Sequence, residues 1–277
     1  MKATERLPAG DYHTHTCFCD GVDTPEAMVQ AAIAHGMRYF GLSGHMPVSC
    51  YENDWCMTEQ QLPIYLQTVR RLQEQYGDRI SILAGVEADT NGTGELDAFD
   101  YRIGSVHSIC RDGIYIEVDG DPARVQSAVE TLFGGDGVAY ACDYFAQTER
   151  IAQIRGCDFI GHFDVVTKFN EKYPFIDTED TRYIQAATQA MDALIDTVPV
   201  MEINTGAISR GWLSHPYPSL PLLREWSRRG GQVIMNSDSH STAHIGAHFD
   251  IGVQWARAAG YTQVLLLTEQ GFTGWKI

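Results

Sequence analysis

The chain lacks long hydrophobic runs and has few basic residues. Its 277 residues include 20 lysines and arginines against 36 aspartates and glutamates, which gives a formal net charge of −16. Proteins that bind nucleic acid through its phosphates need patches of Lys and Arg, so this balance argues against a nucleic-acid partner. No apolar run is long enough to span a bilayer, and residues 1–6 lack the apolar core of a signal peptide. We therefore expect a soluble cytoplasmic protein with no membrane partner.

The seven cysteines lack any recognisable pairing pattern. An odd number cannot pair completely within the chain, and the CxxC spacing of a zinc knuckle is missing. Reduced thiols in the cytosol are the simplest interpretation. Cys17 and Cys19 are the exception, because they directly follow a pair of histidines and are placed to lie near a functional site.

Strand-like and helix-like segments alternate from one end of the chain to the other. The hydrophobic pattern predicts strands at 10–16, 37–43, 80–88, 101–109, 159–162, 198–204, 232–237 and 264–267. Helices are predicted at 24–35, 58–76, 122–133, 139–155, 178–196, 219–229 and 247–259. No linker or repeat interrupts the pattern, so residues 1–277 are expected to form a single domain. This alternation predicts parallel strands closed into an α/β barrel of about seven or eight strands.

Histidines and carboxylates recur at one kind of place, the last residues of the predicted strands. They stand in the stretches 11–15 (DYHTH), 44–45 (GH), 85–87 (GVE), 104–107 (GSVH), 161–162 (GH) and 237–240 (SDSH). Side chains alternate along a strand, so His13 and His15 should point to the same side, as should Asp238 and His240. Reactive groups of α/β barrels lie at the carboxyl ends of the strands. A multinuclear metal site needs such imidazoles and carboxylates, so we expect a metal-dependent hydrolase.

These stretches, in this order and over nearly the whole chain, resemble the PHP family, named for its polymerase and histidinol phosphatase members. The matching pieces are residues 11–16 with 20–21, 44–47 (GHMP), 85–89 (GVEAD), 104–107 (GSVH), 161–164 (GHFD) and 236–240 (NSDSH). The resemblance implies a distorted TIM-like (β/α)7 barrel with a site for up to three metal ions. The hydrophobic pattern predicts one strand more than such a barrel contains. The final run at 264–267 is the simplest one to place outside the barrel.

Within that family the chain is most similar to the monofunctional histidinol-phosphatases. Three features carry this similarity: the stretch 101–107 (YRIGSVH), Lys168 shortly after 161–164, and 202–205 (EINT) followed by Arg210 and the Tyr-Pro pair at 217–218. The resemblance implies a phosphomonoesterase that converts L-histidinol phosphate to L-histidinol and phosphate in histidine biosynthesis. A small phosphorylated substrate is the expected partner, and an oligomer is compatible with the sequence.

The family pattern also implies a set of metal ligands. The first ion is expected at His13, His15, Glu87 and Asp238. Glu87 would bridge to a second ion, held also by His107 and His162, and a third would be held by Asp20, His45 and His240. Two or three divalent ions are expected. Imidazole and carboxylate together suit Zn, Fe or Mn, and this mixture of ligands does not choose among the three metals.

The expected chemistry follows from the charge of such a site. Three divalent ions against three carboxylates would leave it positive, so it would attract a phosphate dianion despite the acidic surface. A metal-activated hydroxide would attack phosphorus, with Glu87, Asp238 and His240 at the catalytic centre. His240 and a metal-bound water both stay open as proton donor to the leaving oxygen. Arg210 and Lys168 are expected to bind the outer phosphate oxygens, Arg210 through a bidentate fork.

Simpler interpretations stay open for several residues. Asp20 lies in an Asp-Gly turn and is either a ligand or a turn residue. Lys168 is either a phosphate contact or a solvated loop charge. Asp164 is either a partner of His162 or a helix cap. His244 fits a surface or cap role better than ligation.

Other functions also stay open. One is a PHP phosphoesterase that acts on another phosphomonoester, a nucleotide, nucleic acid or a phosphotyrosine protein, although the acidic charge disfavours nucleic acid. Another is a C–N hydrolase of the amidohydrolase type, which also has an HxH strand in a barrel. Such enzymes often carry a bridging modified Lys on a strand, whereas Lys168 lies beyond a predicted strand end. The last alternative is a metal-binding protein without enzymatic activity.

Overall fold

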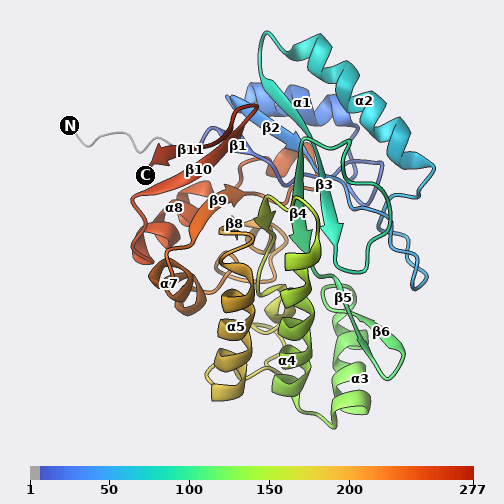
Figure 1. The fold of residues 1–277 in the computed structure, drawn as a ribbon, viewed down its shortest axis with the longest axis vertical. Helices are drawn as coiled ribbons and strands as arrows, with labels where there is room; N and C mark the ends of the chain where they lie inside the picture. The colour runs from blue at the N-terminus through green and yellow to red at the C-terminus, as the bar shows by residue number, and fades with distance from the viewer. Residues whose placement is uncertain (1–6) are drawn as a thin grey trace.

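Nine strands form one curled sheet in the order β1-β2-β3-β4-β7-β8-β9-β10-β11 (Figure 1). The computed structural model describes residues 7–277, so the signal-peptide prediction for residues 1–6 lies outside the described residues. The strands of the sheet are β1 (Gly10–Asp11), β2 (Tyr39–Leu42), β3 (Ser81–Asp89), β4 (Tyr101–Ser105), β7 (Phe159–Ile160), β8 (Val200–Asn204), β9 (Gln232–Asn236), β10 (Gln263–Thr268) and β11 (Gly271–Lys276).

The first seven strands of this order are parallel and close on themselves. An isolated parallel bridge between Thr14 and Ser239 joins the chain after β1 to the chain after β9. The buried Asp11 carboxylate reinforces this closure, because it accepts hydrogen bonds from Ser237 N and Gly246 N, both at 3.0 Å, and from the Ser237 hydroxyl. The predicted distorted (β/α)7 barrel is therefore confirmed, and β10 and β11 extend the sheet beyond it.

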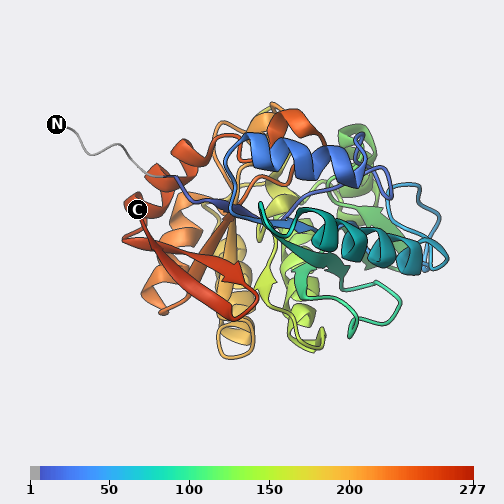
Figure 2. The same ribbon diagram turned by 90° about the horizontal axis from the view of Figure 1, so that it is seen from above.

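Helices cover the outside of the curled sheet (Figures 1 and 2). Helices α1 (Pro25–Ala34) and α2 (Gln61–Tyr76) cover the β2–β3 side, and α3 (Pro122–Phe133), α4 (Gly137–Thr148) and α5 (Thr181–Leu194) stand side by side beyond β4 and β7. The remaining helices are α6 (Gly206–Ser209), α7 (Leu220–Arg228) and α8 (Phe249–Ala258). The predicted start of α1 is confirmed, because the Thr24 hydroxyl accepts a hydrogen bond from Ala27 N at 3.2 Å.

Two regions differ from the sequence-based expectation. The predicted strand at 101–109 is broken: β4 ends at Ser105, and β5 (Ser108–Arg111) pairs antiparallel with β6 (Ile114–Glu117) in a separate two-stranded sheet. Asp112 and Gly113 connect these strands with φ of 50° and 80°, the left-handed backbone of the two-residue turns that favour hairpins. The Asp-Gly pair between apolar strands was the signal for this hairpin. The last run also continues past β10 into β11, which the sequence-based prediction lacks.

Side chains alternate along the barrel strands, and this alternation separates the floor of the barrel from its mouth. On β3, Leu83 faces the interior, while Ala84 and Val86 pack among residues of α1 and α2. Interior side chains near the start of the strands form an apolar layer, here called the barrel floor: Tyr12, Leu83, Tyr101, Ile103, Phe159, Val200, Ile234, Leu265 and Leu267. Two to four residues further along β3, β8 and β9, the interior positions become polar.

Tyr101 is a fully buried ring of this floor that packs directly against two glycines. Its ring lies where side chains of Gly41 and Gly85 would otherwise stand, since a Cβ atom at either glycine would overlap the Tyr101 ring or hydroxyl. The Tyr101 hydroxyl donates a hydrogen bond to the carbonyl of Tyr12. Glycine at 41 and 85 is therefore required by packing, and Gly85 lies two residues before Glu87 on the same interior face of β3. Within residues 7–277, no helix is both long and apolar enough to cross a membrane.

Replacement of Asp11 tests how much the closure contributes to stability. We expect Asp11→Ala to lower the free energy of unfolding by about 3 kcal/mol, because three donors, two of them buried, lose their acceptor. Urea denaturation of chelator-treated protein measures this, with the exposed Asp54→Ala as a matched control expected to change stability by less than about 0.5 kcal/mol. Equal midpoints for both variants would show that the closure lies elsewhere.

Candidate metal centre

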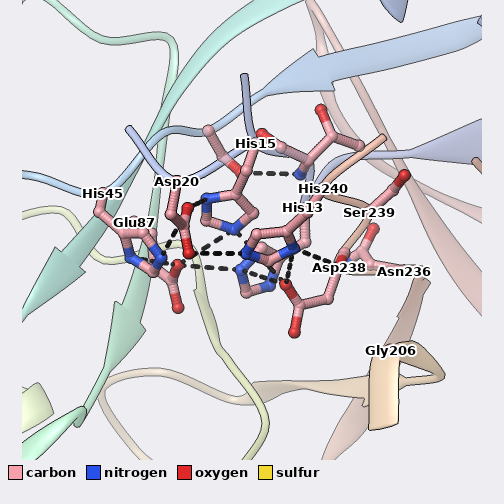
Figure 3. Close-up of polar contacts among 12 residues, drawn as sticks. His13, His15, Asp20, His45, Glu87, Gly206, Asn236, Asp238, Ser239 and His240 are labelled. Carbon is pink, nitrogen blue, oxygen red and sulfur yellow. Dashed lines mark hydrogen bonds and ion pairs between the residues drawn. The ribbon is translucent and has the colours of Figure 1, made fainter. Parts of the chain in front are cut away.

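The carboxyl ends of the barrel strands, with the loops that follow them, bring all nine predicted ligands together. Figure 3 labels all of them except His107 and His162. They form four overlapping groups, and within each group the possible ligand atoms lie within 4.8 Å of one another. The groups are His15 with Asp20, His45 and His240; His13 with His15 and Asp238; His13 with Glu87 and His162; and His45 with Glu87 and His107. Asp20 was expected to be either a metal ligand or a turn residue. Its carboxylate faces the imidazoles of three histidines, which favours the ligand role.

Glu87 lies at the centre of these groups. Its Oε2 atom is 3.0 Å from His13 Nε2, 3.4 Å from His15 Nε2 and 2.9 Å from His45 Nδ1. Its Oε1 atom is 3.1 Å from His107 Nε2 and 2.9 Å from His162 Nε2. One carboxylate on β3 thus faces five imidazoles, with its two oxygens directed at different sets. This is the arrangement expected of a carboxylate that bridges two cations.

Two further carboxylates complete the centre. Asp238 Oδ1 lies 3.5 Å from His15 Nε2 and 3.8 Å from His13 Nε2, so it faces the predicted histidine pair. Asp20 Oδ2 is 3.0 Å from His240 Nε2, and its Oδ1 is 3.6 Å from His45 Nε2. The predicted third group is therefore found, with His15 as an additional member.

The donor set fits metal ions. The buried atoms His13 Nε2, His15 Nε2, His45 Nδ1 and Glu87 Oε2 face one another and have no hydrogen-bond partner in the described part of the chain. Buried polar atoms are almost always satisfied, so a group of unsatisfied nitrogen and oxygen atoms needs an explanation. Nitrogen and carboxylate lone pairs converging on one point are satisfied by a divalent cation.

The pKa shifts show carboxylates and imidazoles that stabilise each other's charged forms at this centre. Burial raises the pKa of Glu87, but the imidazoles of His13, His107 and His45 hold it well below its usual range. Burial likewise opposes ionisation of Asp238, and Arg210 and His13 hold its pKa well below normal. Burial lowers the pKa of His45, yet Glu87 and Asp20 raise it to about 9. The carboxylates are therefore ionised at neutral pH, and a cation bound at His45 would displace a proton.

A buried carboxylate behind the ligands was missed by the sequence-based prediction. Glu202 on β8 is 0% exposed, and its Oε1 lies 2.8 Å from His13 Nδ1, the nitrogen that faces away from Glu87. Its Oε2 accepts a hydrogen bond from His162 N at 2.8 Å. Asn204 and Asn236 donate to the same carboxylate at 2.9 Å. Glu202 therefore fixes the ring of His13, as carboxylates behind metal-bound histidines do.

Asp89 plays the same part for His107. Its Oδ2 atom is 3.0 Å from His107 Nδ1 and accepts a hydrogen bond from His107 N at 2.8 Å. Asp89 follows Glu87 by two positions on β3, so strand alternation brings both carboxylates to the interior face. That spacing, and the position of Glu202 near the end of β8, were the available signals for both residues.

Gly206 allows the close packing around Asp238. A Cβ atom at this position would lie 2.9 Å from Asp238 Cβ and 2.7 Å from Arg210 Nη2. Asp238 itself has φ of 49°, which is uncommon outside glycine and clusters at functional sites. The end of β9 and the start of α6 are thus shaped around one carboxylate.

A cavity of about 230 Å³ opens above the centre, and both predicted substrate residues line it. Arg210 Nη2 lies 2.8 Å from Asp238 Oδ2, and its Nη1 donates to Asp238 O at 2.9 Å. Lys168 is only 12% exposed, and its Nζ donates to Asp119 O at 2.6 Å. Lys168 is therefore no solvated loop charge. The same cavity is lined by Trp55, Glu117 and Asp119. From the sequence, Trp55 was either a shelter for an imidazole or a packing residue, and the two acidic residues were unassigned.

The other open residues lie outside the centre. Asp164 Oδ2 accepts a hydrogen bond from Ser219 N at 2.9 Å, so it fixes the chain before α7 and does not contact His162 in the described structure. His244 is absent from the four groups formed by the described residues. Cys19 Sγ lies 3.5 Å from His15 Nδ1, as its place after the histidine pair suggested, and burial raises the pKa of this thiol to about 12.

Comparison with known proteins supports these assignments at the level of family and fold. A model of the PHP domain matches residues 11–206. The chain is 31% identical over 264 residues to a probable histidinol-phosphatase from Deinococcus radiodurans, with 90% of this chain and 93% of that protein covered. It is 25% identical over 244 residues to the histidinol-phosphatase of Lactococcus lactis, with 83% of each chain covered.

A solved structure shows the same fold. The histidinol phosphate phosphatase of Lactococcus lactis, complexed with Zn, L-histidinol and phosphate, superimposes with a TM-score of 0.72 at 22% identity. The match covers 97% of this chain and 100% of that one. The distorted barrel predicted from the sequence is thus found in a solved protein.

Replacement of Glu202 tests its support of the centre. We expect Glu202→Gln to weaken Zn²⁺ affinity by about 10- to 100-fold, because the charge that orients His13 and raises its basicity is lost. Competition with a chromogenic chelator measures the affinity. The exposed Glu59→Gln is the matched control and should bind Zn²⁺ like the wild type. Unchanged affinity in Glu202→Gln would contradict the role given to this carboxylate.

Proposed function

The chain belongs to the PHP domain family, and we propose that it is a metal-dependent phosphatase that releases phosphate from L-histidinol phosphate. One observation carries the metal-dependent part: Glu87 faces five imidazoles at 2.9–3.4 Å beneath a cavity lined by Arg210 and Lys168. The substrate part is supported by relatives named as histidinol-phosphatases over most of their length.

We propose two or three divalent ions at this centre. His13, His15 and Asp238 would hold the first, and Asp20 with His45 and His240 the third. Glu87 would hold the second together with His107 and His162, whose Nε2 atoms lie 3.1 Å and 2.9 Å from its Oε1. Because the four groups overlap, His15 and His45 could each bind either of two neighbouring ions. Zinc is favoured because the ligands are imidazoles and carboxylates and because the related Lactococcus structure contains Zn. When bound, such ions supply an activated water and neutralise the phosphoryl oxygens.

The side chains of this protein then hold and orient the substrate. Arg210 presents a planar fork from the wall of the cavity and would bind two outer phosphate oxygens. Its contact with Asp238 keeps the guanidinium in place beside a proposed ligand. Lys168 would add a second positive charge. Glu87, Asp238 and His240 all line the cavity, so they would hold the ions at the catalytic centre, on the side where phosphorus would lie.

The geometry favours phosphate ester hydrolysis over C–N hydrolysis. A carboxylated lysine bridging two ions would need its Nζ among the imidazoles. Lys168 Nζ instead lies beside Asp119, 3.5 Å from its Oδ2, and the bridging position between the histidines is held by Glu87.

An assay of phosphate release tests the function. Purified protein loaded with Zn²⁺ or Mn²⁺ should hydrolyse L-histidinol phosphate with kcat/KM at least about tenfold above that for sugar phosphates, nucleotides and p-nitrophenyl phosphate, and chelation should abolish the reaction. A faster reaction with several other esters would disprove the substrate and leave the chemistry standing. Absence of phosphate release from every ester in the metal-loaded protein would disprove the chemistry.

Arg210→Ala separates substrate binding from metal binding. We expect kcat/KM for L-histidinol phosphate to fall about 100-fold, because a charge-assisted bidentate contact to phosphate is lost, while metal content stays at the wild-type level. Arg210→Lys should recover only part of the loss, since Lys cannot form the fork. Arg155→Ala, with a side chain 70% exposed, is the control. Loss of metal in Arg210→Ala would show that Arg210 supports Asp238 and does not bind phosphate.

A further inference from the structure

One wall of the cavity is acidic, although the proposed substrate carries a phosphate dianion. Glu117 and Asp119 both line the cavity, together with Lys168. Two carboxylates and one ammonium group leave this wall with a net charge of −1. Neither carboxylate belongs to the metal-binding groups formed by the described residues. These two carboxylates are not needed for metal binding and would repel the phosphate group of the substrate. They therefore indicate that a cationic group binds at this wall.

Glu117 positions an aromatic ring at the rim of this wall. The Trp55 indole donates from Nε1 to Glu117 Oε1 at 2.9 Å. The same indole ring lies 4.8 Å from the His45 ring and 5.1 Å from the His107 ring, measured between centroids. Trp55 thus stands over two candidate ligands and supplies an apolar face beside the acidic groups, which suits a flat heterocycle.

Asp119 is held so that its carboxylate faces the cavity. Lys168 Nζ binds the Asp119 carbonyl at 2.6 Å and lies 3.5 Å from Asp119 Oδ2. The Asp119 side chain remains 27% exposed. Burial opposes its ionisation, but Lys168 and the imidazoles of His107 and His162 hold its pKa below the usual value. Asp119 is therefore a fixed anion with room for a second cationic partner.

The hairpin that carries Glu117 is anchored to the loop that carries Trp55. The ring of Tyr115 stacks on Tyr51 with centroids 5.3 Å apart. At the other end, Asn91 Nδ2 donates to Ser108 O and Ser108 Oγ, both at 3.2 Å. These contacts fix the hairpin β5–β6 relative to the mouth of the barrel. Glu117 at its end and Asp119 just after it therefore form a preformed acidic surface.

We propose that Asp119 recognises the ammonium group of the substrate and that the hairpin β5–β6 with Trp55 forms the wall that selects an amino alcohol phosphate. The inference rests on the proposed function. In L-histidinol phosphate the ammonium-bearing carbon is next to the carbon that carries the phosphate ester. An ester seated between the metal centre and Arg210 therefore carries its ammonium group into the same small cavity. Asp119 offers the ionic hydrogen bond there, and Trp55 covers the imidazole.

A comparison of two substrates with two proteins tests this inference. The substrates are L-histidinol phosphate and its analogue without the amine, 3-(imidazol-4-yl)propyl phosphate. Removal of the amine should lower kcat/KM of the Zn²⁺-loaded wild type by about 10- to 100-fold, mainly through KM. Asp119→Asn should lower kcat/KM for L-histidinol phosphate by a similar factor. With the analogue, the wild type and Asp119→Asn should agree within about threefold, because the interaction is already absent.

Asp112→Asn is the matched control. It makes the same chemical change in the hairpin that precedes Asp119, at a turn position with φ of 50° that Asn adopts readily, and Asp112 is exposed. It should leave both substrates unaffected. Metal content is measured for every variant. A loss of metal in Asp119→Asn, or an equal loss of kcat/KM for both substrates, would show that Asp119 supports the centre in general and would overturn the inference.

Failure of the inference and failure of the proposed function give different results. If the wild type hydrolyses L-histidinol phosphate well and Asp119→Asn does too, the function stands and the inference is wrong. If the wild type prefers esters without an amine, the proposed substrate is wrong, and the role of Asp119 as an ammonium site is disproved with it.

Discussion

The fold is organised around a buried carboxylate that cannot remain without positive charge. The Glu87 side chain is fully buried, and the five imidazoles around it offer lone pairs as readily as protons. Burying an anion in a protein interior is costly unless it is paired or coordinates a metal. The strands β1, β2, β4 and β7 each end just before one or two of these imidazoles. Glu202 and Asp89 fix the rings of His13 and His107 from behind. A cation bound at this mouth would therefore stabilise the fold as well as supply the proposed chemistry.

The barrel floor explains why the polar groups gather at only one end. Interior positions near the start of the strands carry Leu83, Val200 and Ile234, and two to four positions later the same faces carry Glu87, Glu202 and Asn236. The period of two along a strand keeps every such set on one face. Tyr101 occupies the space that two glycines leave free below Glu87. A closely packed floor thus sets the height at which the ligands lie.

Much of this was predictable from the sequence, because strand alternation and strand ends determine which side chains meet. The nine candidate ligands each follow or end a short apolar run, and the parallel order of the runs brings those ends to one mouth. Residues that act through other residues were harder to find. Glu202 and Asp89 look like any carboxylate near a strand end until a ligand ring is seen against them. Their position was predictable, but their partner was not.

The hairpin β5–β6 was missed for a different reason. The fourth predicted strand was extended through 101–109, so the Asp-Gly turn at 112–113 was not considered and the wall of the cavity went unseen. Lys168 was either a phosphate contact or a solvated loop charge in the sequence-based prediction, whereas in the structure it contacts the carbonyl of Asp119, just after that hairpin. Contacts between loops of distant strands are set by tertiary packing, which local patterns do not encode.

The same hairpin has a consequence for how this kind of protein diversifies. Its two strands pair only with each other, and neither joins the nine-stranded sheet. Insertions, deletions or substitutions in this hairpin do not change the hydrogen bonds that align the ligand-bearing strands. Mutations in the hairpin can therefore change the lining of the cavity without altering the strands that carry the candidate ligands.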